Sequence, residues 1–577
     1  MIPGKSTIDQ LFNGTRVFEI PFYQRSYVWG EKQWERLLSD IVSVGQKTTD
    51  YFLGAIILKQ IIAGTAKWGD YKVVIDGQQR LTTLAILLKV LYLKQGLNEW
   101  FKRKFFLPDG TLAIQHSRID RGDFQKIMQL ESCDEIDGKS NIIKAYNYFR
   151  ENLDPGTIDE NRLKYNIQVI DIIIDNNDDE QQIFDTINSL GVDLTTAELL
   201  KNHLFSEDTL AEYKSLWEPA FEKDEEYIRF WAQSLLKGRN KQMNIEAFLN
   251  AFLQIKVHDP NLSVSSDDKI EYAKASALFY SYKNFIKTYY SGHEFDFVKE
   301  LVSYAKIYQD TFSPDVVDYS LTHEAGIDRV NFLVFATDGT TMIPFIMYVI
   351  KNVSDKYEQV KIFEYLESYI VRRLICRKST KSYSDLFSEH LINANIQTVE
   401  DVIAYINEKD ASNNLAMPNN AELLRCCKEI EHPNYRGLAI LYLLESKMRN
   451  SSLLTTQLLK YNSYTLEHLM PQKWVANWPL PANGDSEVRS HMIKTLGNFT
   501  MITQPLNSTI SNEAWSVKLS GKNNKGGLKD YASGLLTLSN VLASTTWDEQ
   551  SIENRSTWLA GQAARIWPSC LPGDASL

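Results

Sequence analysis

One strand, turn and helix constrains the N-terminal fold of this chain more than any other feature. The apolar strand from Tyr71 to Ile75 leads into a tight turn that reads Asp76-Gly77-Gln78-Gln79-Arg80. A helix follows, and its apolar face carries Leu81, Leu84, Leu88 and Leu91. Shorter strand-like and helical runs alternate around it within the first 100 residues, which indicates an α/β or α+β domain.

The turn has the composition of an anion-binding site. Free backbone N–H groups at a helix start, together with the helix dipole, favour a negative charge, and the Arg80 guanidinium suits a phosphate. A nucleotide or a DNA phosphate could therefore bind there. The alternative is structural, since Asp76 followed three residues later by Gln79 is also a capping-box pattern that needs no ligand.

A second polar and aromatic cluster precedes this turn. Residues 21–29 read PFYQRSYVW and place Gln24 and Arg25 among aromatic side chains that could stack on a base. The alternative is an aromatic core strand from which Arg25 extends its charged end to water.

The rest of the chain is mostly helical until its C-terminal part. From about residue 141 helical patterns dominate, with residues 166–174 (NIQVIDIII) as one strand. Polar residues interrupt the pattern at 257–268, and a further helical region is expected to act as a scaffold. The segment 410–420 (DASNNLAMPNN), rich in Asn and Ser, is the expected linker.

Composition excludes several classes of protein. With 577 residues, 44% hydrophobic and 12% aromatic, the chain has the apolar area for more than one core. No apolar run approaches the roughly 18 residues of a membrane helix, and the first ten residues do not resemble a signal peptide, so we expect a cytoplasmic protein. The five cysteines are scattered and form no C-x-x-C pair, so any metal is expected to be held by oxygen or His.

The net charge of -11 counts against nucleic acid, but it is unevenly distributed. Residues 1–100 carry 12 basic and 9 acidic groups, and residues 461–577 carry 9 of each, which leaves -14 for residues 101–460. Both ends could therefore meet a polyanion, whereas the middle is less suited.

A second chemical site lies near the C-terminus. Residues 464–472 (YTLEHLMPQ) read as a short strand ended by Pro, with Glu467 and His468 adjacent. A second strand is expected from Phe499 to Thr503, and a helix around residues 513–519, after Asn507. This order of strand, loop, strand and helix suits a ββα-metal nuclease.

The residue types fit phosphodiester hydrolysis, which needs a base to activate water and a cation to stabilise the leaving oxyanion. His468 meets the first need, and a carboxylate with an amide oxygen, Glu467 and Asn507, can hold Mg²⁺ for the second. The alternative is that Glu467 and His468 form a satisfied polar pair without catalytic function. His491 is a rival base, although it is expected at a helix start facing solvent. Four lysines could follow a DNA backbone or belong to a solvated helix and loop: Lys518, Lys522, Lys525 and Lys529.

Several motifs together resemble a known family. Residues 20–29 (IPFYQRSYVW), 52–58 (FLGAIIL), 74–84 (VIDGQQRLTTL) and 183–205 (IFDTINSLGVDLTTAELLKNHLF) are similar to the N-terminal domain of GmrSD-type modification-dependent (Type IV) restriction systems. The resemblance implies a ParB-like fold that binds and hydrolyses a nucleoside triphosphate, GTP or ATP. It implies a pocket lined by Asp76, Gly77, Gln78, Gln79, Arg80, Gln24 and Arg25. A P-loop is absent from the sequence, and the motif with Asn188, Gly191, Lys201 and Asn202 has no assigned role.

The C-terminal motifs resemble the HNH domain of the same family. They comprise YTLEHLMPQ, LGNFTMI, the stretch from Asn507 to Lys518, and the closing Trp547, Arg555 and Trp567. The resemblance implies His468 as general base, Glu467 and Asn507 as ligands of Mg²⁺ or another divalent cation, and Asn498 as a brace for the loop that orients His468. The sequence departs from the commonest HNH pattern in having Glu before His and Asn where many members have a last His.

We therefore predict an α+β multidomain protein. The predicted parts are a ParB-like α/β sensor domain (1–235), a helical scaffold (236–410) and an HNH endonuclease domain embedded in helices (411–577). Its predicted function is NTP-regulated cleavage or nicking of modified or foreign double-stranded DNA in defence against phage. The alternatives are a non-cleaving DNA-sensing module, or an NTPase with a degenerate nuclease domain.

The sequence leaves several properties open. The relatives of the SspE kind, which nick phosphorothioate DNA, share the two-domain layout, so the recognised modification could be on a base or on the backbone. The preferred nucleotide and the choice between a nick and a double-strand break are undetermined. One HNH site per chain would need a homodimer or two visits to cut both strands.

Overall fold

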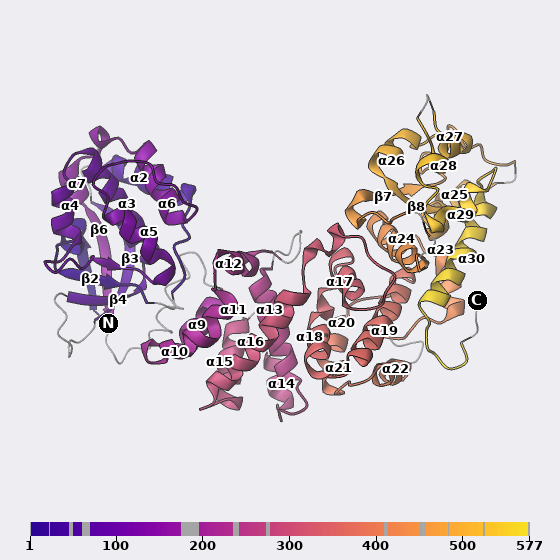
Figure 1. The fold of residues 1–577 in the computed structure, drawn as a ribbon, viewed down its shortest axis with the longest axis horizontal. Helices are drawn as coiled ribbons and strands as arrows, with labels where there is room; N and C mark the ends of the chain where they lie inside the picture. The colour runs from indigo at the N-terminus through magenta and orange to yellow at the C-terminus, as the bar shows by residue number, and fades with distance from the viewer. Residues whose placement is uncertain are drawn as a thin grey trace. The chain divides into compact units, whose positions relative to one another are not determined.

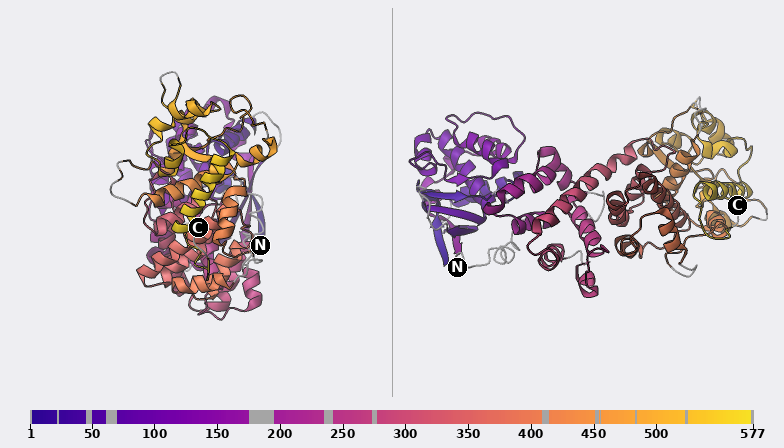
Figure 2. Two further views of the ribbon diagram at one scale, coloured as in Figure 1. Left: turned by 90° about the vertical axis from the view of Figure 1, so that its right-hand side faces the viewer. Right: turned by 60° about the horizontal axis from the view of Figure 1, so that its bottom comes forward.

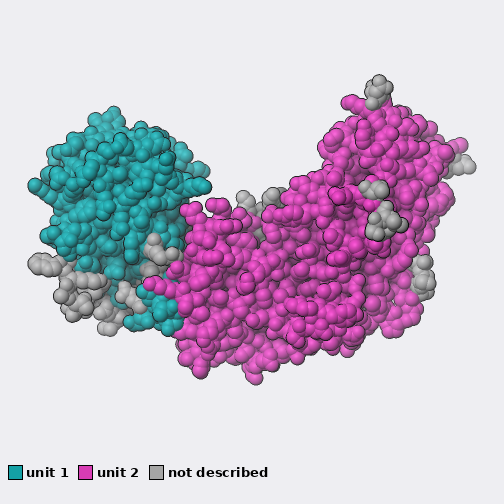
Figure 3. Space-filling model, in the orientation of Figure 1, with its two compact units in different colours: residues 1–213 teal, residues 214–577 magenta. Residues whose placement is uncertain are grey.

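The structure is a computed structural model, and its described part divides into two compact units (Figure 3). They comprise residues 1–213 and 214–577. The described residues are 2–21, 24–44, 50–60, 70–174, 195–234, 242–272, 277–408, 414–450, 454, 456–482, 484–522 and 525–574. The predicted three-part division of the chain stays a prediction.

A mixed six-stranded sheet forms the centre of the first unit, with its strands in the order β1-β6-β3-β4-β2-β5. The strands are β1 (Ile2–Thr7), β2 (Arg16–Glu19), β3 (Tyr51–Gln60), β4 (Asp70–Asp76), β5 (Ile114–Gln115) and β6 (Ile167–Ile174). β3 runs antiparallel to β4 and parallel to β6, whereas β2 runs parallel to both β4 and β5. The mixed sheet and its helices confirm the expectation of an α+β protein for this part of the chain (Figures 1 and 2). The ParB-like fold stays a prediction.

Helix α3 is the central helix of this unit. The helices are α1 (Ile8–Leu11), α2 (Glu31–Val44), α3 (Gln78–Lys94), α4 (Asn98–Phe105), α5 (Arg118–Met128), α6 (Asn141–Asn152), α7 (Glu160–Tyr165) and α9 (Thr196–Leu204). α3 is apolar nearly all round and is therefore buried along most of its length. Its buried Lys89 donates to Asn98 Oδ1 and to Leu130 O, both at 2.7 Å, and burial lowers the pKa of this lysine to about 8.

The second unit is largely helical and contains one short strand pair. Its longer helices are α12 (Glu225–Ala232), α13 (Asn244–Val257), α15 (Leu278–Tyr289), α16 (Glu294–Thr311), α17 (Ile327–Ala336), α18 (Ile343–Asn352), α19 (Lys356–Ile375), α22 (Val399–Asn407), α23 (Asn420–Glu429), α24 (Asn434–Met448) and α30 (Glu549–Ile566). The strands β7 (Tyr464–His468) and β8 (Phe499–Thr503) pair antiparallel. Between and after them lie α25 (Ser486–Met492), the 3₁₀ turn η10 (Leu496–Asn498), α26 (Gln504–Ile510), α27 (Trp515–Ser520), α28 (Leu528–Tyr531) and α29 (Ser539–Leu542).

A buried ion pair joins the helical region to the C-terminal end of the chain. Arg329 on α17 and Glu367 on α19 make two contacts of 2.7 Å, and both side chains are almost fully buried. The Trp567 indole donates to the same carboxylate at 2.8 Å. Arg372, five residues further along α19, donates to Trp567 O at 2.7 Å. Arg329 and Glu367 satisfy each other's charge, which a buried pair requires.

The prediction of a linker at residues 410–420 is wrong for the part that the structure describes, residues 414–420. Leu415, Ala416 and Met417 are buried in this segment. Its backbone carbonyls accept hydrogen bonds from α19, including Tyr369 to Leu415 O and Arg373 to Ala416 O, each at 2.8 Å. The segment is polar on average, but its three apolar side chains are buried. The segment therefore belongs to the core. Within the described residues, we find no helix that combines the length and the apolar character needed to span a bilayer.

Candidate functional site

The strand pair β7 and β8 presents the C-terminal candidate residues. His468 pairs with Phe499 and Glu467 with Thr500 across the two strands. The helix that follows differs from the prediction, because α26 begins at Gln504, directly after β8. Pro505 lies in its first turn, where a missing N–H costs nothing. Asn507 therefore lies on this helix, and the predicted helix near residues 513–519 is the next one, α27.

The side chain of Asn498 holds the end of β7 in place. It is 0% exposed, and its amide nitrogen donates to Met470 O at 2.8 Å and Ile493 O at 2.9 Å. Its amide oxygen accepts from Met470 N at 2.8 Å and from the Trp547 indole at 3.1 Å. The amide thus joins the loop after His468 to the loop before β8 and to the C-terminal region.

Arg555 on α30 binds the backbone at the start of β8, next to Asn498. Its guanidinium donates to Gly497 O at 2.8 Å and to Phe499 O at 2.6 Å. Gly497 leaves no room for a side chain, because an added Cβ would lie 2.2 Å from Ser556 Oγ. The close approach of α30 to η10 explains why this position is a glycine.

His468 is buried but faces an exposed side chain. It is 9% exposed, its ring meets Phe499 edge-on at 4.9 Å, and its Nε2 lies 3.0 Å from the amide nitrogen of the exposed Gln472. Burial, and then the charge of Lys518, lower the pKa of His468 to about 4. The ring is therefore neutral at neutral pH. Because the Gln472 amide donates, Nε2 accepts and the ring proton sits on Nδ1.

Glu467 forms a buried ion pair that the sequence did not reveal. Lys518 Nζ contacts Glu467 Oε1 and donates to His468 O at 2.7 Å. The sequence suggested that Lys518 follows a DNA backbone or lies on a solvated face. Both predictions are wrong, because Lys518 is 0% exposed. Burial raises the pKa of Glu467 and lowers that of Lys518, and each charge opposes the shift of the other.

Asn507 turns its amide nitrogen to β7. It donates to Thr465 Oγ1 at 3.1 Å and to Leu466 O at 3.2 Å. Thr465 and Glu467 share one face of β7 because side chains alternate along a strand. The amide of Asn507 and the carboxylate of Glu467 therefore belong to the same side of the strand pair.

The rival base His491 does not belong to this group. It lies in the last turn of α25, not at a helix start as expected, and is exposed. Its Nδ1 lies 3.0 Å from Glu431 Oε1, in a surface ion pair. His491 therefore serves as a natural control for His468.

At the N-terminal turn, Gly77 provides the start of α3. Its φ of 104° is left-handed, and an added Cβ would lie 2.5 Å from Ile56 Cγ2, so only glycine fits. The helix begins at Gln78, and no side chain caps it. The capping-box alternative is therefore wrong, because the N-cap is Gly77 and Asp76 makes no capping bond.

The two glutamines of the turn hold the segment that contains Gln24 and Arg25. Gln78 donates to Arg25 O at 2.6 Å, and Gln79 accepts from Val28 N at 2.9 Å. Gln24 donates to Ile75 O at 3.1 Å and also contacts Val74 O. The structure thus brings these predicted residues together. Gln78 is only 8% exposed, yet its buried Oε1 has no hydrogen-bond partner among the described residues.

Arg80 lies across the neighbouring strand. Its Nη1 donates to Ala55 O at 2.6 Å and lies 3.7 Å from Asp76 Oδ2. Gly54, with a φ of 128°, leaves space for this guanidinium, because an added Cβ would lie 3.0 Å from Arg80 Nε. Of the second N-terminal motif, Asn188 and Gly191 lie outside the described residues. Lys201 and Asn202 lie on α9, where Lys201 is buried.

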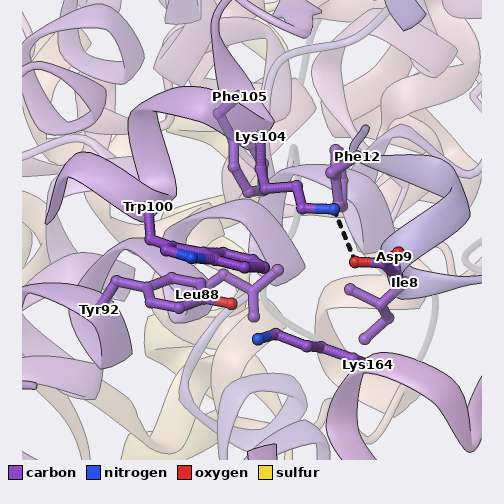
Figure 4. Close-up of a pocket in the computed structure, with 9 residues that line it drawn as sticks. All are labelled: Ile8, Asp9, Phe12, Leu88, Tyr92, Trp100, Lys104, Phe105 and Lys164. Atoms are coloured by element: carbon purple, nitrogen blue, oxygen red, sulfur yellow. Dashed lines mark hydrogen bonds and ion pairs between the residues drawn. The ribbon is translucent and has the colours of Figure 1, made fainter. Parts of the chain in front are cut away.

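A pocket elsewhere in this unit is not part of either candidate site (Figure 4). It is lined by Ile8, Asp9, Phe12, Leu88, Tyr92, Trp100, Lys104, Phe105 and Lys164. Lys104 pairs with Asp9 at 2.7 Å, and Lys164 Nζ lies 4.0 Å from the centre of the Trp100 ring. These contacts satisfy the charges that line it, and no residue of the turn or of the strand pair reaches it.

Breaking the buried ion pair of the C-terminal site should destabilise the second unit strongly. Substitution Lys518→Met leaves the Glu467 carboxylate buried without a partner, and we expect a loss of about 3–5 kcal/mol in the free energy of unfolding. The matched control is Lys522→Met, which removes an exposed lysine paired with Glu513 and should cost less than about 1 kcal/mol. Urea unfolding of both full-length variants measures the two losses in the free energy of unfolding. Equal losses would contradict the burial of Lys518.

Comparison with known families gives two matches. The model of the GmrSD restriction endonuclease N-terminal domain matches residues 8–205. The model of the GmrSD restriction endonuclease C-terminal domain matches residues 417–562. The turn lies in the first match and the strand pair in the second. No curated protein was found to match the chain.

Proposed function

Because the chain belongs to the GmrSD restriction endonuclease family, we propose that it is a metal-dependent DNA endonuclease regulated by a nucleoside triphosphate and directed at modified or foreign DNA. Membership of the family implies a restriction nuclease role and a DNA substrate. The metal, the nucleotide and the modification are the parts that belong to the proposal.

The observation that carries the nuclease assignment is the state and position of His468. A general base must be deprotonated before it can take a proton from water, and burial keeps this imidazole neutral at neutral pH. Its Nε2 accepts from Gln472, an exposed side chain, so this amide would have to move aside before the nitrogen could take a proton from water. Asn498 binds the loop after His468, and Arg555 binds the partner strand at Phe499, so the backbone around the imidazole is held in place.

The oxygen atoms of Glu467 and Asn507 are the proposed ligands of a hard divalent cation. Both side chains lie on one side of β7, and carboxylate and amide oxygens are ligands that Mg²⁺ accepts. Among the described residues, Asn507 contacts β7 through its amide nitrogen, which leaves its oxygen for the ion. Lys518 contacts one oxygen of Glu467, and its positive charge opposes a second cation there, so the ion would bind the other oxygen. A cation held by these residues would stabilise the oxyanion that leaves the phosphodiester.

The N-terminal turn is the proposed nucleotide site, for GTP or ATP. The N-terminus of α3 has no side-chain cap, and its dipole favours a phosphate. The unpartnered Oε1 of Gln78 is a buried acceptor that a ligand N–H or O–H could satisfy, as a base or ribose would supply. Gln24, Arg25 and Arg80 surround the same turn. Binding there could bias the nuclease between silent and active states, since a nuclease must spare the DNA of its own cell.

Plasmid cleavage tests the proposed nuclease. The purified full-length chain is incubated with unmodified, glucosylated hydroxymethylcytosine and phosphorothioate plasmids, with Mg²⁺, in the presence and absence of GTP or ATP. We expect cleavage of one modified substrate, and His468→Ala should lower its rate by about 10²–10⁴-fold. The control His491→Ala removes an exposed histidine of the same unit and should cleave at the wild-type rate.

Two outcomes would contradict this assignment. Equal loss in both histidine variants would mean that His468 has no special role. An absence of metal-dependent cleavage on every substrate would favour a DNA-sensing module or an NTPase with a degenerate nuclease domain. The form of the product, nicked circle or linear plasmid, separates single-strand from double-strand cutting.

Arg80→Ala tests the coupling to the nucleotide. We expect it to lower NTP hydrolysis at least tenfold and to remove the effect of NTP on cleavage, because it removes the guanidinium beside the helix start. The control Arg103→Ala changes an exposed arginine of the same unit and should leave both activities unchanged. If Arg80→Ala loses NTP turnover yet cuts every substrate with unchanged rate and selectivity, the proposed control of the nuclease by NTP is refuted.

A further inference from the structure

Two helices of the second unit bring three metal-ligating side chains together at a distance from the nuclease residues. Cys376 ends α19, and Glu422 and Cys426 lie one turn apart on α23, which packs against α19. Their sulfur and carboxylate oxygen atoms all lie within 4.8 Å of one another. Cys376 and Cys426 are 7% and 2% exposed. Neither the turn nor the strand pair uses any of the three.

The spacing of these residues explains why no sequence motif predicts the group. The chain contains no C-x-x-C pair, so a metal is expected on oxygen or His. Glu422 and Cys426 are four residues apart and share a face of α23, whereas Cys376 lies 50 residues before Cys426. Only the packing of α19 on α23 places the two sulfurs side by side.

The distances suit a tetrahedral cation with soft ligands. With Zn–S near 2.3 Å and Zn–O near 2.0 Å, neighbouring ligand atoms of a tetrahedral zinc lie roughly 3.5–3.8 Å apart. Small side-chain rotations would bring a cluster within 4.8 Å to that spacing. Two thiolates select zinc over magnesium or calcium, which prefer oxygen alone.

Glu422 already has one cation beside it. Lys378 Nζ lies 2.6 Å from Glu422 Oε1, so this carboxylate takes part in an ion pair at the edge of the group. Zinc binds cysteine as the thiolate, so binding of the ion would release the protons of the two thiols.

We propose that Cys376, Glu422 and Cys426 form a binding site for one zinc ion, with water as the fourth ligand. The ion would join the end of α19 to α23. α23 in turn packs against η10, which contains Asn498. The zinc ion would thus cross-link two helices that pack beside the strand pair. Its ligands are different residues from those proposed for the catalytic cation.

Cobalt titration of the reduced, full-length chain tests this site. Co²⁺ bound by thiolates gives a sulfur-to-metal charge-transfer band, whereas Co²⁺ at Glu467 and Asn507, with oxygen ligands, gives none. We expect the band to saturate at one Co²⁺ per chain and to disappear when Zn²⁺ is added. The double variant Cys376→Ser with Cys426→Ser should lose the band.

Two further variants serve as controls. Cys427→Ser removes a buried thiol from the same helix, next to Cys426, and should keep the band. Glu422→Gln alters a half-buried side chain that leaves both sulfurs in place, so the band should persist with at least tenfold weaker binding. Because this variant spares the core, it tests the site even if the serine variants do not fold.

Three results would overturn the proposal. They are no charge-transfer band in the wild-type chain, equal binding by the wild-type chain and the folded double variant, and unchanged affinity in Glu422→Gln. A Cys376–Cys426 disulfide with no bound zinc, found by mass spectrometry of protein purified without reductant, would assign the pair to a redox contact instead.

Discussion

The C-terminal site depends on one buried amide. Asn498 makes four hydrogen bonds, and they connect the loop after His468, the loop before β8 and Trp547. A buried amide left with one group unpaired would cost about 1–3 kcal/mol, so this arrangement permits few alternatives. Arg555 adds two backbone contacts to the same corner. The loop after His468 and the start of β8 are therefore held by a network that substrate does not need to touch.

The buried ion pair of Lys518 and Glu467 is the second feature that shapes the C-terminal site. Lys518 places a buried positive charge against Glu467 and the His468 carbonyl, and it helps to keep the imidazole neutral. A buried pair of this kind is costly to break and contributes little net stability compared with apolar packing. Lys518 opposes the effect of burial on the pKa of Glu467, and after burial it is the second cause that lowers the pKa of His468. At the N-terminal turn the pair of Arg80 and Asp76 is only half-buried, and the Gln78 oxygen, which has no partner among the described residues, suggests a site that a ligand completes.

The sequence predicted the local features well and the long-range ones poorly. The second strand of the pair, residues 499–503, and the turn at Gly77 were found because apolar runs and turn residues are local signals. Helix α26 was not predicted, although Pro505 in its first turn is a residue often found at a helix start. The partner of Glu467 was missed because it lies 51 residues away on α27. The cysteine pair and the packed segment at 415–417 likewise depend on contacts that no spacing in the sequence encodes, and the roles of the site residues stay predictions.

The pH dependence of cleavage tests the central claim, that His468 is a neutral general base, most directly. Single-turnover cleavage would be followed from about pH 5 to about pH 8 at saturating Mg²⁺. An exposed histidine would lose activity around pH 6.5, whereas a histidine with a pKa near 4 stays unprotonated through this range. We therefore expect no acid limb centred between about pH 6 and 7. A limb centred at about pH 6.5 would show that the imidazole titrates as it does in water and that burial does not keep His468 neutral.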